Sequence, residues 1–519
     1  MSGKKNLLIV LLMIVLLGVV AGGLVWNATH YTMIDFKFYP RDAAVLDLRD
    51  QALTVSQYER FVRQLPDCQI RWNIPFQGQT YPDTTDTVTI TSLSESDIRI
   101  LGYFPSLKTV EAEGCTDYAA LQLLCQTLPE VTVRYSIPLG GTAYPSGADT
   151  VLLTGVTQEE VSLLKYLPNL RSVTLAGGDS LDGADDLQEY CQNNTISFHL
   201  QFGSETVPTS AAELTISGAT EGDLSLLSLL PELKKLQLDD PAASAQTVTG
   251  LSKAYPKLSV SWNKTVWGAT VENGVEELDL SAATPTTLEE VEAACAYFPT
   301  LKEVFLGRCD QLDYEKIADY RERSRSQYKV VWTVNFRDKM FVRSDEKSFF
   351  PCHPNNGRLC NFNDTDARNL KYLEEVEAID VGHMPLTDSS WLKYMPKLKY
   401  LILSWTGVTN LDGIENCKEL IFLECTDGPL KSIEGIQECT ALEDVNLSAT
   451  PADITPLLDM PWLNSVYLIY CRGGDAYKVS QALPDTRVCA SGDASVGGGW
   501  RRLPNYYAMR DALGAYYMN

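Results

Sequence analysis

The sequence predicts an α/β solenoid with a parallel sheet, preceded by one transmembrane helix. Two internal repeats predict the solenoid. Near the C-terminus an apolar triplet returns every 21 or 22 residues, and in the N-terminal half a longer unit returns at 63 to 68 residues. An uncharged run at the N-terminus predicts the helix. A chain of 519 residues is also too long for one simple core, which favours a repeat array or several domains.

The uncharged run covers residues 7–26. A helix rises about 1.5 Å per residue, so this run matches a hydrocarbon core of about 30 Å, whereas a cleavable signal has an apolar region of only about 7 to 15 residues. Two lysines precede the run. We therefore expect residues 1–6 to be a cytoplasmic tail, 7–26 a single-pass membrane anchor, and the C-terminal region extracellular. Cleavage after the small residues 21–23 is the alternative.

The long repeat occupies residues 27–336. Each unit predicts a strand, a helix, a second strand, a second helix, and then an alternating strand that turns at glycine into an extra β-arm. Thr157 followed by Glu160 has the spacing of a capping box, and Thr284 followed by Pro285 suits the start of another helix. The most regular marker of the unit reads YFPSLKTV, YLPNLRSV, LLPELKKL and YFPTLKEV, beginning at Tyr103, Tyr166, Leu229 and Tyr297.

Two further segments interrupt or end the repeats. Residues 337–366 are rich in turn formers and follow neither repeat, so they are predicted to be an insertion or linker. Residues 476–519 follow the last short repeat and carry scattered aromatic and apolar residues after a glycine run. An open solenoid end exposes core residues, so we expect this tail to be a C-terminal cap, with a separate binding peptide as the alternative.

The short repeat occupies residues 367–475 and has the form L-x-x-L-x-L. This pattern predicts a short strand with inward residues, followed by a turn and a return arm. One such unit cannot bury its apolar face, whereas stacked units form one parallel sheet with strands about 4.8 Å apart. The triplets are Val376, Ile379, Val381; Leu398, Leu401, Leu403; Leu420, Leu423, Cys425; Leu442, Val445, Leu447; and Leu463, Val466, Leu468.

This pattern resembles the leucine-rich repeat family, and its period is similar to that of bacterial internalin-like surface proteins. The resemblance implies a leucine-rich-repeat-type solenoid and a role in protein binding or adhesion at the cell surface. The sequence departs from the family consensus where an asparagine usually caps the turn. That position holds Met384, Thr406, Gly428, Thr450 and Cys471.

Charge and motif content exclude several functions. The net charge of -24 disfavours nucleic acid, whose binding relies on Lys and Arg that neutralise phosphates. The chain holds four histidines and shows no P-loop, no G-x-S-x-G and no H-E-x-x-H pattern. We therefore expect no enzyme activity and no cofactor.

Cys352, His353 and Cys360 form the one cluster of potential metal ligands. A structural zinc needs four ligands, and a fourth is missing at a suitable spacing, so we expect no metal. A disulfide between Cys352 and Cys360 suits a location outside the cell. A pair of free thiols stays the alternative.

The family resemblance implies that residues between and just after each triplet face the concave side of the solenoid. Exposed aromatic residues there would suit a ligand, and the acidic residues beside them would favour a basic or polar protein, or a glycan. The alternative is that the cap or the insertion covers these rings, and that the chain is a structural envelope scaffold or sensor subunit without a soluble ligand. The predicted ligand-binding residues are Tyr400, Ile402, Trp405, Phe422, Glu424, Asp427, Tyr467 and Tyr470.

Overall fold

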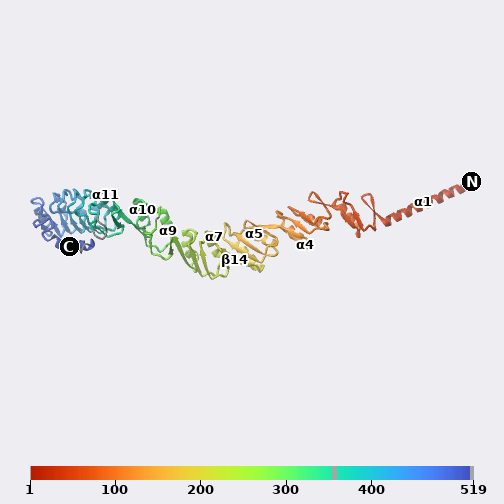
Figure 1. Cartoon of the computed structure of the whole chain (residues 1–519), viewed down its shortest axis with the longest axis horizontal. Helices are drawn as coiled ribbons and strands as arrows, with labels where there is room; N and C mark the ends of the chain where they lie inside the picture. The colour runs from red at the N-terminus through yellow and green to blue at the C-terminus, as the bar shows by residue number, and fades with distance from the viewer. Residues whose placement is uncertain (1, 284, 353–358, 515–519) are drawn as a thin grey trace. The chain divides into compact units, whose positions relative to one another are not determined.

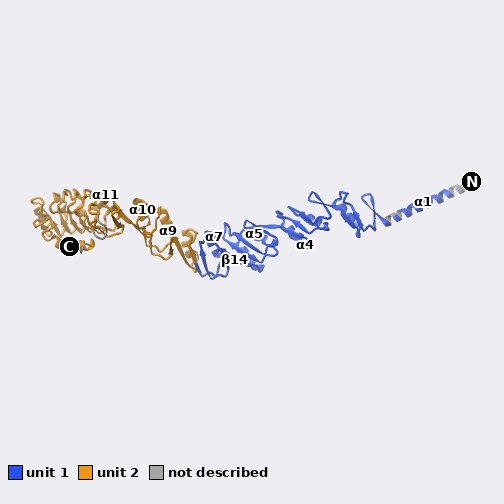
Figure 2. Ribbon diagram, in the orientation of Figure 1, with its two compact units in different colours: residues 1–236 blue, residues 237–519 orange. Residues whose placement is uncertain are grey.

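The computed structural model describes residues 2–283, 285–352 and 359–514, except for the side chains of residues 2–7, 24, 25, 27 and 28. The chain divides into two compact units, residues 1–236 and residues 237–519, which Figure 2 shows in separate colours. The predicted domain boundaries at residues 336, 366 and 475 stay predictions.

Unit 1 begins with α1 (Ser2–His30), whose large apolar side chains between residues 8 and 20 are exposed. Within the described ranges, none of the helices combines the length and the apolar character that crossing a bilayer requires. The predicted anchor over residues 7–26 therefore has no support from the structure. Part of it, the side chains of residues 7, 24 and 25, lies outside what the structure describes.

The long repeats are built from parallel strands, intervening helices and a closing hairpin, as predicted. In one repeat, β12 (Thr150–Thr154), β13 (Ser172–Ala176) and β14 (Ser197–Phe202) pair in parallel (Figure 1). β14 then turns at Gly203, which has a φ of 57°, into the antiparallel β15 (Glu205–Pro208). This hairpin is the predicted β-arm.

The other elements that begin in unit 1 follow the same order of strands and helices. They are β1 (Tyr31–Ile34), β2 (Lys37–Pro40), β3 (Val45–Asp47), α2 (Val55–Gln64), β4 (Gln69–Arg71), β5 (Asn73–Phe76), β6 (Gln79–Pro82), β7 (Thr87–Thr89), α3 (Glu95–Leu101), β8 (Thr109–Glu111), α4 (Tyr118–Thr127), β9 (Thr132–Arg134), β10 (Ser136–Leu139), β11 (Thr142–Pro145), α5 (Gln158–Leu163), η1 (Leu164–Tyr166), α6 (Ala184–Asn193), β16 (Glu213–Ser217), α7 (Glu221–Ser225), η2 (Leu226–Leu229) and β17 (Lys235–Asp239).

Capping boxes start several of the helices. At α5 the backbone N–H of Glu160 donates to Thr157 Oγ1 at 3.3 Å, and the backbone N–H of Thr157 donates to Glu160 Oε2 at 2.9 Å, which confirms the predicted box. The other predicted cap, Thr284, lies outside the described residues. The helix that follows it, α9 (Leu288–Cys295), is capped by Thr287, whose side chain accepts from the N–H of Glu290.

Unit 2 opens with the last long repeats. The predicted insertion, residues 337–366, contains β24 (Met340–Arg343), β25 (Ser348–Phe349) and the start of α11 (Asp364–Ala367). β24 pairs with β23 (Thr333–Phe336) in another antiparallel hairpin. The elements before the C-terminal sheet are α8 (Ala245–Ala254), β18 (Ser259–Val266), β19 (Ala269–Glu272), β20 (Glu277–Asp279), α9, β21 (Glu303–Phe305), α10 (Tyr314–Ser324), β22 (Lys329–Val331), β23 (Thr333–Phe336), β24 (Met340–Arg343), α11 (Asp364–Ala367) and η3 (Arg368–Tyr372).

The short repeats form one parallel sheet in chain order. Leu401 pairs with Leu423, and Leu423 pairs with Val445, so equivalent residues of successive repeats lie side by side. This arrangement is a leucine-rich-repeat-type solenoid. The strands are β25 (Ser348–Phe349), β26 (Ala378–Asp380), β27 (Tyr400–Ile402), β28 (Phe422–Glu424), β29 (Asp444–Asn446), β30 (Ser465–Tyr467) and β31 (Arg487–Cys489).

Short helical turns form the return arms of the repeats: η4 (Ser390–Tyr394), η5 (Ile414–Asn416), η6 (Ile436–Glu438), η7 (Thr455–Asp459) and finally α12 (Asp475–Ala482). One apolar core begins in the last long repeats at Val266. It continues between these return arms and the sheet as far as Leu483. It includes Cys417 and Cys439, which occupy equivalent positions in two successive repeats and are both buried. Burial of apolar area at about 25 cal/mol per Å² makes this core the main stabilising term.

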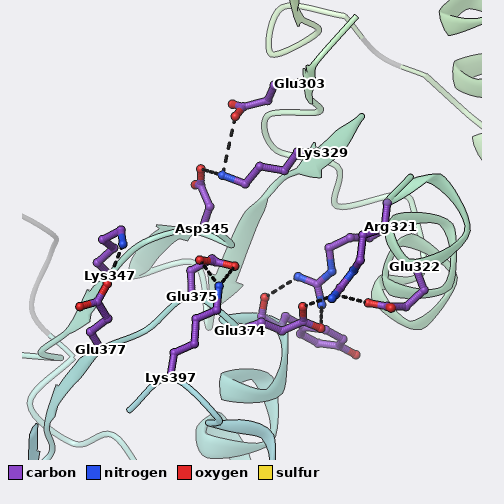
Figure 3. A network of polar contacts seen from close by, with 12 residues as sticks. Glu303, Arg321, Glu322, Lys329, Asp345, Lys347, Glu374, Glu375, Glu377 and Lys397 are labelled. Atoms are coloured by element: carbon purple, nitrogen blue, oxygen red, sulfur yellow. Dashed lines mark hydrogen bonds and ion pairs between the residues drawn. The ribbon is translucent and has the colours of Figure 1, made fainter. Parts of the chain in front are cut away.

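Ion pairs connect successive strands of unit 2 at their N-terminal ends (Figure 3). Glu377 lies just before β26 and accepts from Lys347 Nζ at 2.6 Å and from Lys399 Nζ at 2.7 Å. These two ammonium groups lower the pKa of Glu377. Glu303 and Asp345 bracket Lys329 in the same way. Because two of these groups are exposed and the other four are only partly buried, solvent screens each pair, which contributes about 0–1 kcal/mol.

Arg321 differs from these surface cations because its side chain is mostly buried. Its guanidinium lies 4.8 Å from the ring centroid of Trp332, donates to the carbonyl of Tyr372 at 3.1 Å and pairs with Glu374. Glu374 also accepts from Arg325 at 2.9 Å. Burial lowers the pKa of Arg321, and the charge of Glu374 counteracts that effect.

We expect Glu374→Gln to lower the free energy of unfolding by about 1–3 kcal/mol, because it leaves a mostly buried guanidinium without its carboxylate. Urea denaturation followed by tryptophan fluorescence measures this change. The exposed pair of Lys418 and Glu438, 3.0 Å apart, provides the matched control. Glu438→Gln should change stability by less than about 0.5 kcal/mol, and equal effects of the two variants would contradict the assignment.

Candidate functional site

The C-terminal sheet has an outer face, which corresponds to the predicted concave face. Side chains alternate along each strand between the core and this face. The parallel register aligns the outer side chains of β26 to β30 in two rows. The first row is Ala378, Tyr400, Phe422, Asp444 and Ser465, and the second is Asp380, Ile402, Glu424, Asn446 and Tyr467.

Much of this outer face is covered by the end of the chain. Residues 490–514, here the cover segment, contain η8 (Trp500–Arg502) and α13 (Pro504–Ala512) and lie against the stacked strands (Figure 1). Trp500 is fully buried, with its ring centroid 4.6 Å from that of Phe422 and 5.0 Å from that of Tyr467. A second apolar cluster, separate from the main core, thus joins the cover segment to the sheet.

Hydrogen bonds fix the cover segment in place. Trp500 Nε1 donates to Glu424 Oε2 at 2.6 Å in a buried setting. Asn505 Nδ2 donates to Glu443 Oε2 at 2.9 Å and to Asp444 Oδ2 at 2.8 Å. Burial raises the pKa of Glu424, although the bond from Trp500 favours its charged form. The acidic residues of the outer face therefore bind the chain's own donors.

The predicted binding residues fall into three groups. Four are buried beneath the cover segment or between strands, so in this conformation they contact the protein itself rather than a ligand. Two are partly exposed and two are exposed. The buried group is Ile402, Phe422, Glu424 and Tyr467; the partly exposed group is Tyr400 and Asp427; the exposed group is Trp405, at 59% of its surface, and Tyr470, at 64%.

The expectation that all eight residues are accessible is wrong for the buried group, because the tail folds over the outer face. The first part of the tail adds β31 to the sheet beside β30. The rest folds back over the outer face, and Trp500 meets Glu424 across 76 residues of sequence. The one sequence signal for this contact is the apolar spacing of Trp500, Leu503, Met509 and Leu513 after the glycine run.

A row of left-handed residues follows the strands. Each has a backbone φ between 54° and 62°. In four of them the backbone N–H donates to a carbonyl of the next repeat, at 2.7–3.1 Å. This conformation costs about 1–2 kcal/mol for a residue other than glycine, so the ladder of hydrogen bonds holds it in place. The row, here the αL row, is His383, Trp405, Asp427, Ala449 and Tyr470.

Within the αL row, Trp405 and His383 form an exposed aromatic pair. Their ring centroids lie 5.8 Å apart with an interplanar angle of 12°. Sequence reasoning singled out Trp405 but missed His383, whose 22-residue spacing from Trp405 was the available signal. The other end of the row contacts the cover segment, since Tyr470 Oη donates to the carbonyl of Gly492 at 3.2 Å and Ser495 donates to Asp427.

A pocket of about 270 Å³ lies beside this aromatic pair. Strand residues and cover-segment residues line it together. Asp380 is partly buried there, and its Oδ1 accepts from the backbone N–H of Gly382 at 3.0 Å. Burial, and secondarily the charge of Glu424, raise the pKa of Asp380 to about 6. The lining is Phe350, Asp380, Gly382, His383, Ile402, Ser404, Glu424, Arg501, Tyr506, Met509, Arg510 and Leu513.

The cysteine cluster has no metal geometry in the part of the chain that the structure describes. Cys352 and Cys360 have a Cα–Cα distance of 5.1 Å, which lies within the range of disulfides, whereas His353 lies outside the described residues. No group of three or more His, Cys, Asp or Glu side chains among the described residues is arranged to hold a metal ion. The other cysteines form no disulfide.

No family model matches the chain, and no curated protein matches it. Among solved structures, internalin C2 of Listeria monocytogenes shares 17% identity, with 48% of this chain and 91% of that chain covered and a TM-score of 0.24. Internalin F of the same organism shares 12% identity, with coverages of 80% and 91% and a TM-score of 0.23. A leucine-rich repeat protein of Leptospira interrogans shares 12%, with coverages of 86% and 90% and a TM-score of 0.22. The repeat architecture of this chain follows from the strand register described above.

We expect Trp500→Ala to release the cover segment, because it removes a fully buried ring and the donor to Glu424. Loss of such a side chain costs about 3–5 kcal/mol. Limited trypsin digestion at Arg501, Arg502 and Arg510 should become faster than in the parent chain. Trp462→Ala, which removes a partly exposed ring at 36% exposure, serves as the control and should leave the cleavage rate unchanged. Equal cleavage in all three proteins would contradict the docking described here.

We expect Asp380→Asn to stabilise the chain at pH 7.5 but not at pH 4. The folded-state pKa of Asp380 lies above its ordinary value, so its favourable contribution is complete at low pH and is lost as pH rises through about 6. Asparagine does not ionise, so the variant avoids this loss of folding stability. The expected gain in the free energy of unfolding is about 1–2 kcal/mol after allowance for solvent in the pocket. Thermal unfolding at both pH values measures the difference. Asp412→Asn, at an exposed position outside the pocket, should show no pH-dependent gain.

Proposed function

We propose that this chain is a recognition protein that binds a protein or glycan ligand through the uncovered part of its leucine-rich-repeat array. The contact surface is the αL row, centred on the ring pair of Trp405 and His383. The partly exposed Tyr400 and Asp427 and the exposed Tyr470 extend it. The buried Ile402, Phe422, Glu424 and Tyr467 support this surface from beneath rather than touching the ligand.

The observation that carries the proposal is the conformation of Trp405. Its ring is 59% exposed, although aromatic rings are costly to leave in water. Its backbone is left-handed with a φ of 59°, a region that bulky residues rarely adopt. A position that is unfavourable in both respects, and is held by ladder hydrogen bonds, fits a preorganised binding residue.

We also propose that the chain acts at the cell surface, attached to the membrane through residues 7–26. The exposed apolar side chains of α1 and the closeness of Cys352 to Cys360 support an exported location. As part of the same proposal, we infer that the 22-residue repeats are related to those of bacterial internalin-like surface proteins. Fractionation that leaves the chain fully in the aqueous phase would contradict the attachment.

A structural role is the second candidate. The cover segment occupies the face that many binding repeats would leave open, and this burial favours an envelope scaffold or sensor subunit without a soluble ligand. In that case the αL row would carry no binding energy.

We expect Trp405→Ala to reduce ligand capture by about 30-fold or more, as loss of a central aromatic residue does at other interfaces. The whole chain, kept in mild detergent because α1 exposes apolar side chains, would be immobilised and exposed to cell-surface proteins and a glycan array. Tyr477→Ala is the matched control, since Tyr477 is an equally exposed ring on α12, at 69% exposure. Equal capture by both variants, or none by the parent, would favour the structural role.

A further inference from the structure

The pocket beneath His383 carries an inference beyond ligand recognition by the αL row. It is a built cavity of about 270 Å³ within unit 2, and two separate parts of the chain form its walls. Strands β26 to β28 supply one wall and α13 of the cover segment supplies the opposite one. This volume lies just below the range of about 300–1,000 Å³ that is typical of small-molecule pockets, so the cavity suits a small ligand.

The two walls differ in charge. The strand wall presents the carboxylates of Asp380 and Glu424, and the cover segment presents the guanidinium groups of Arg501 and Arg510. These groups lie close enough to influence one another, because Arg510 favours the charged form of Asp380 and Arg501 favours that of Glu424. Among the side chains that the structure describes, none makes an ion pair with Asp380, whose one hydrogen bond comes from a backbone N–H.

The described lining also has an apolar part. Phe350, Ile402, Met509 and Leu513 contribute it, beside the polar side chains of His383, Ser404 and Tyr506. An inorganic ion would not cover these apolar surfaces, which would remain in contact with water. A divalent cation would in addition be repelled by the two guanidinium groups. A ligand that fits these groups needs a cation for Asp380, an anion for Arg501 and an apolar body that lies against Ile402, Met509 and Leu513.

We propose that this pocket binds a free α-amino acid with an apolar side chain. Its ammonium group donates to Asp380, its carboxylate accepts from Arg501, and its side chain packs against Ile402, Met509 and Leu513. His383 lies at the same pocket and stacks on Trp405, so an occupied pocket lies next to the aromatic pair of the αL row.

The state of Asp380 agrees with this assignment. A partly buried carboxylate without a cation destabilises the folded chain at neutral pH, since burial raises its pKa. Asparagine could keep the bond from Gly382 without that cost. A binding role explains why a charge stands at this position, because a ligand ammonium supplies the missing partner.

Isothermal titration calorimetry of the whole chain with L-leucine tests the proposal. Two isosteres test its two charges: isoamylamine lacks the carboxylate and 4-methylpentanoate lacks the ammonium group. We expect saturable binding of leucine, with each isostere at least about tenfold weaker because a charged hydrogen bond is lost. No binding of leucine, or binding of either isostere as tight as that of leucine, would overturn the proposal.

Variants locate the binding. Asp380→Asn should weaken leucine binding by about 10- to 100-fold while leaving the chain folded. Arg501→Gln should weaken it as well, and Asp412→Asn, outside the pocket, should not. Leucine binding that survives Asp380→Asn would place the site elsewhere and overturn the assignment. Capture of macromolecules by the αL row is measured separately, so failure of one proposal leaves the other unaffected.

Discussion

The in-register pairing of successive short strands is the constraint on which the rest of unit 2 depends. Each repeat contributes only three residues to the sheet, too few to be stable alone. Equivalent apolar residues such as Leu401, Leu423 and Val445 must therefore lie side by side, and each return arm must bring the chain back in the same register. Once this register is fixed, equivalent residues of successive repeats form columns. These columns include the two outer rows, the αL row and its hydrogen bonds.

The same constraint explains why the outer face holds so many large and acidic residues. Columns on a flat sheet expose every second side chain, and an apolar column left in water favours association with any matching surface. The cover segment resolves this within the chain by placing Trp500 on Phe422 and Tyr467. Acidic residues such as Glu424 and Asp444 then serve as acceptors for Trp500 and Asn505. The uncovered remainder, around Trp405, is what stays available to a partner.

The sequence predicted those parts of the structure that repeat and missed those that do not. Strand positions and the β-arms follow from periodicity, because each copy reinforces the others. The docking of Trp500 onto Glu424 joins residues 76 positions apart in a single copy, so no repeat marks which residues meet. The same holds for the pocket, which needs strand and cover-segment residues together. The eight predicted binding residues were all chosen from their position in the repeat. Position in the repeat alone could not distinguish the exposed Trp405 from the buried Tyr467.

The positions that violate local rules are more informative about function than the regular ones. Trp405 occupies a left-handed backbone that glycine or asparagine would adopt at less cost, and Asp380 holds a charge where an amide would be more stable. Both lie at the same margin of the sheet, linked through His383, which stacks on one and lines the pocket of the other. Stability alone selects against each of them. Their combination at one place is better explained by recognition, since a ligand supplies the contacts that the free chain lacks.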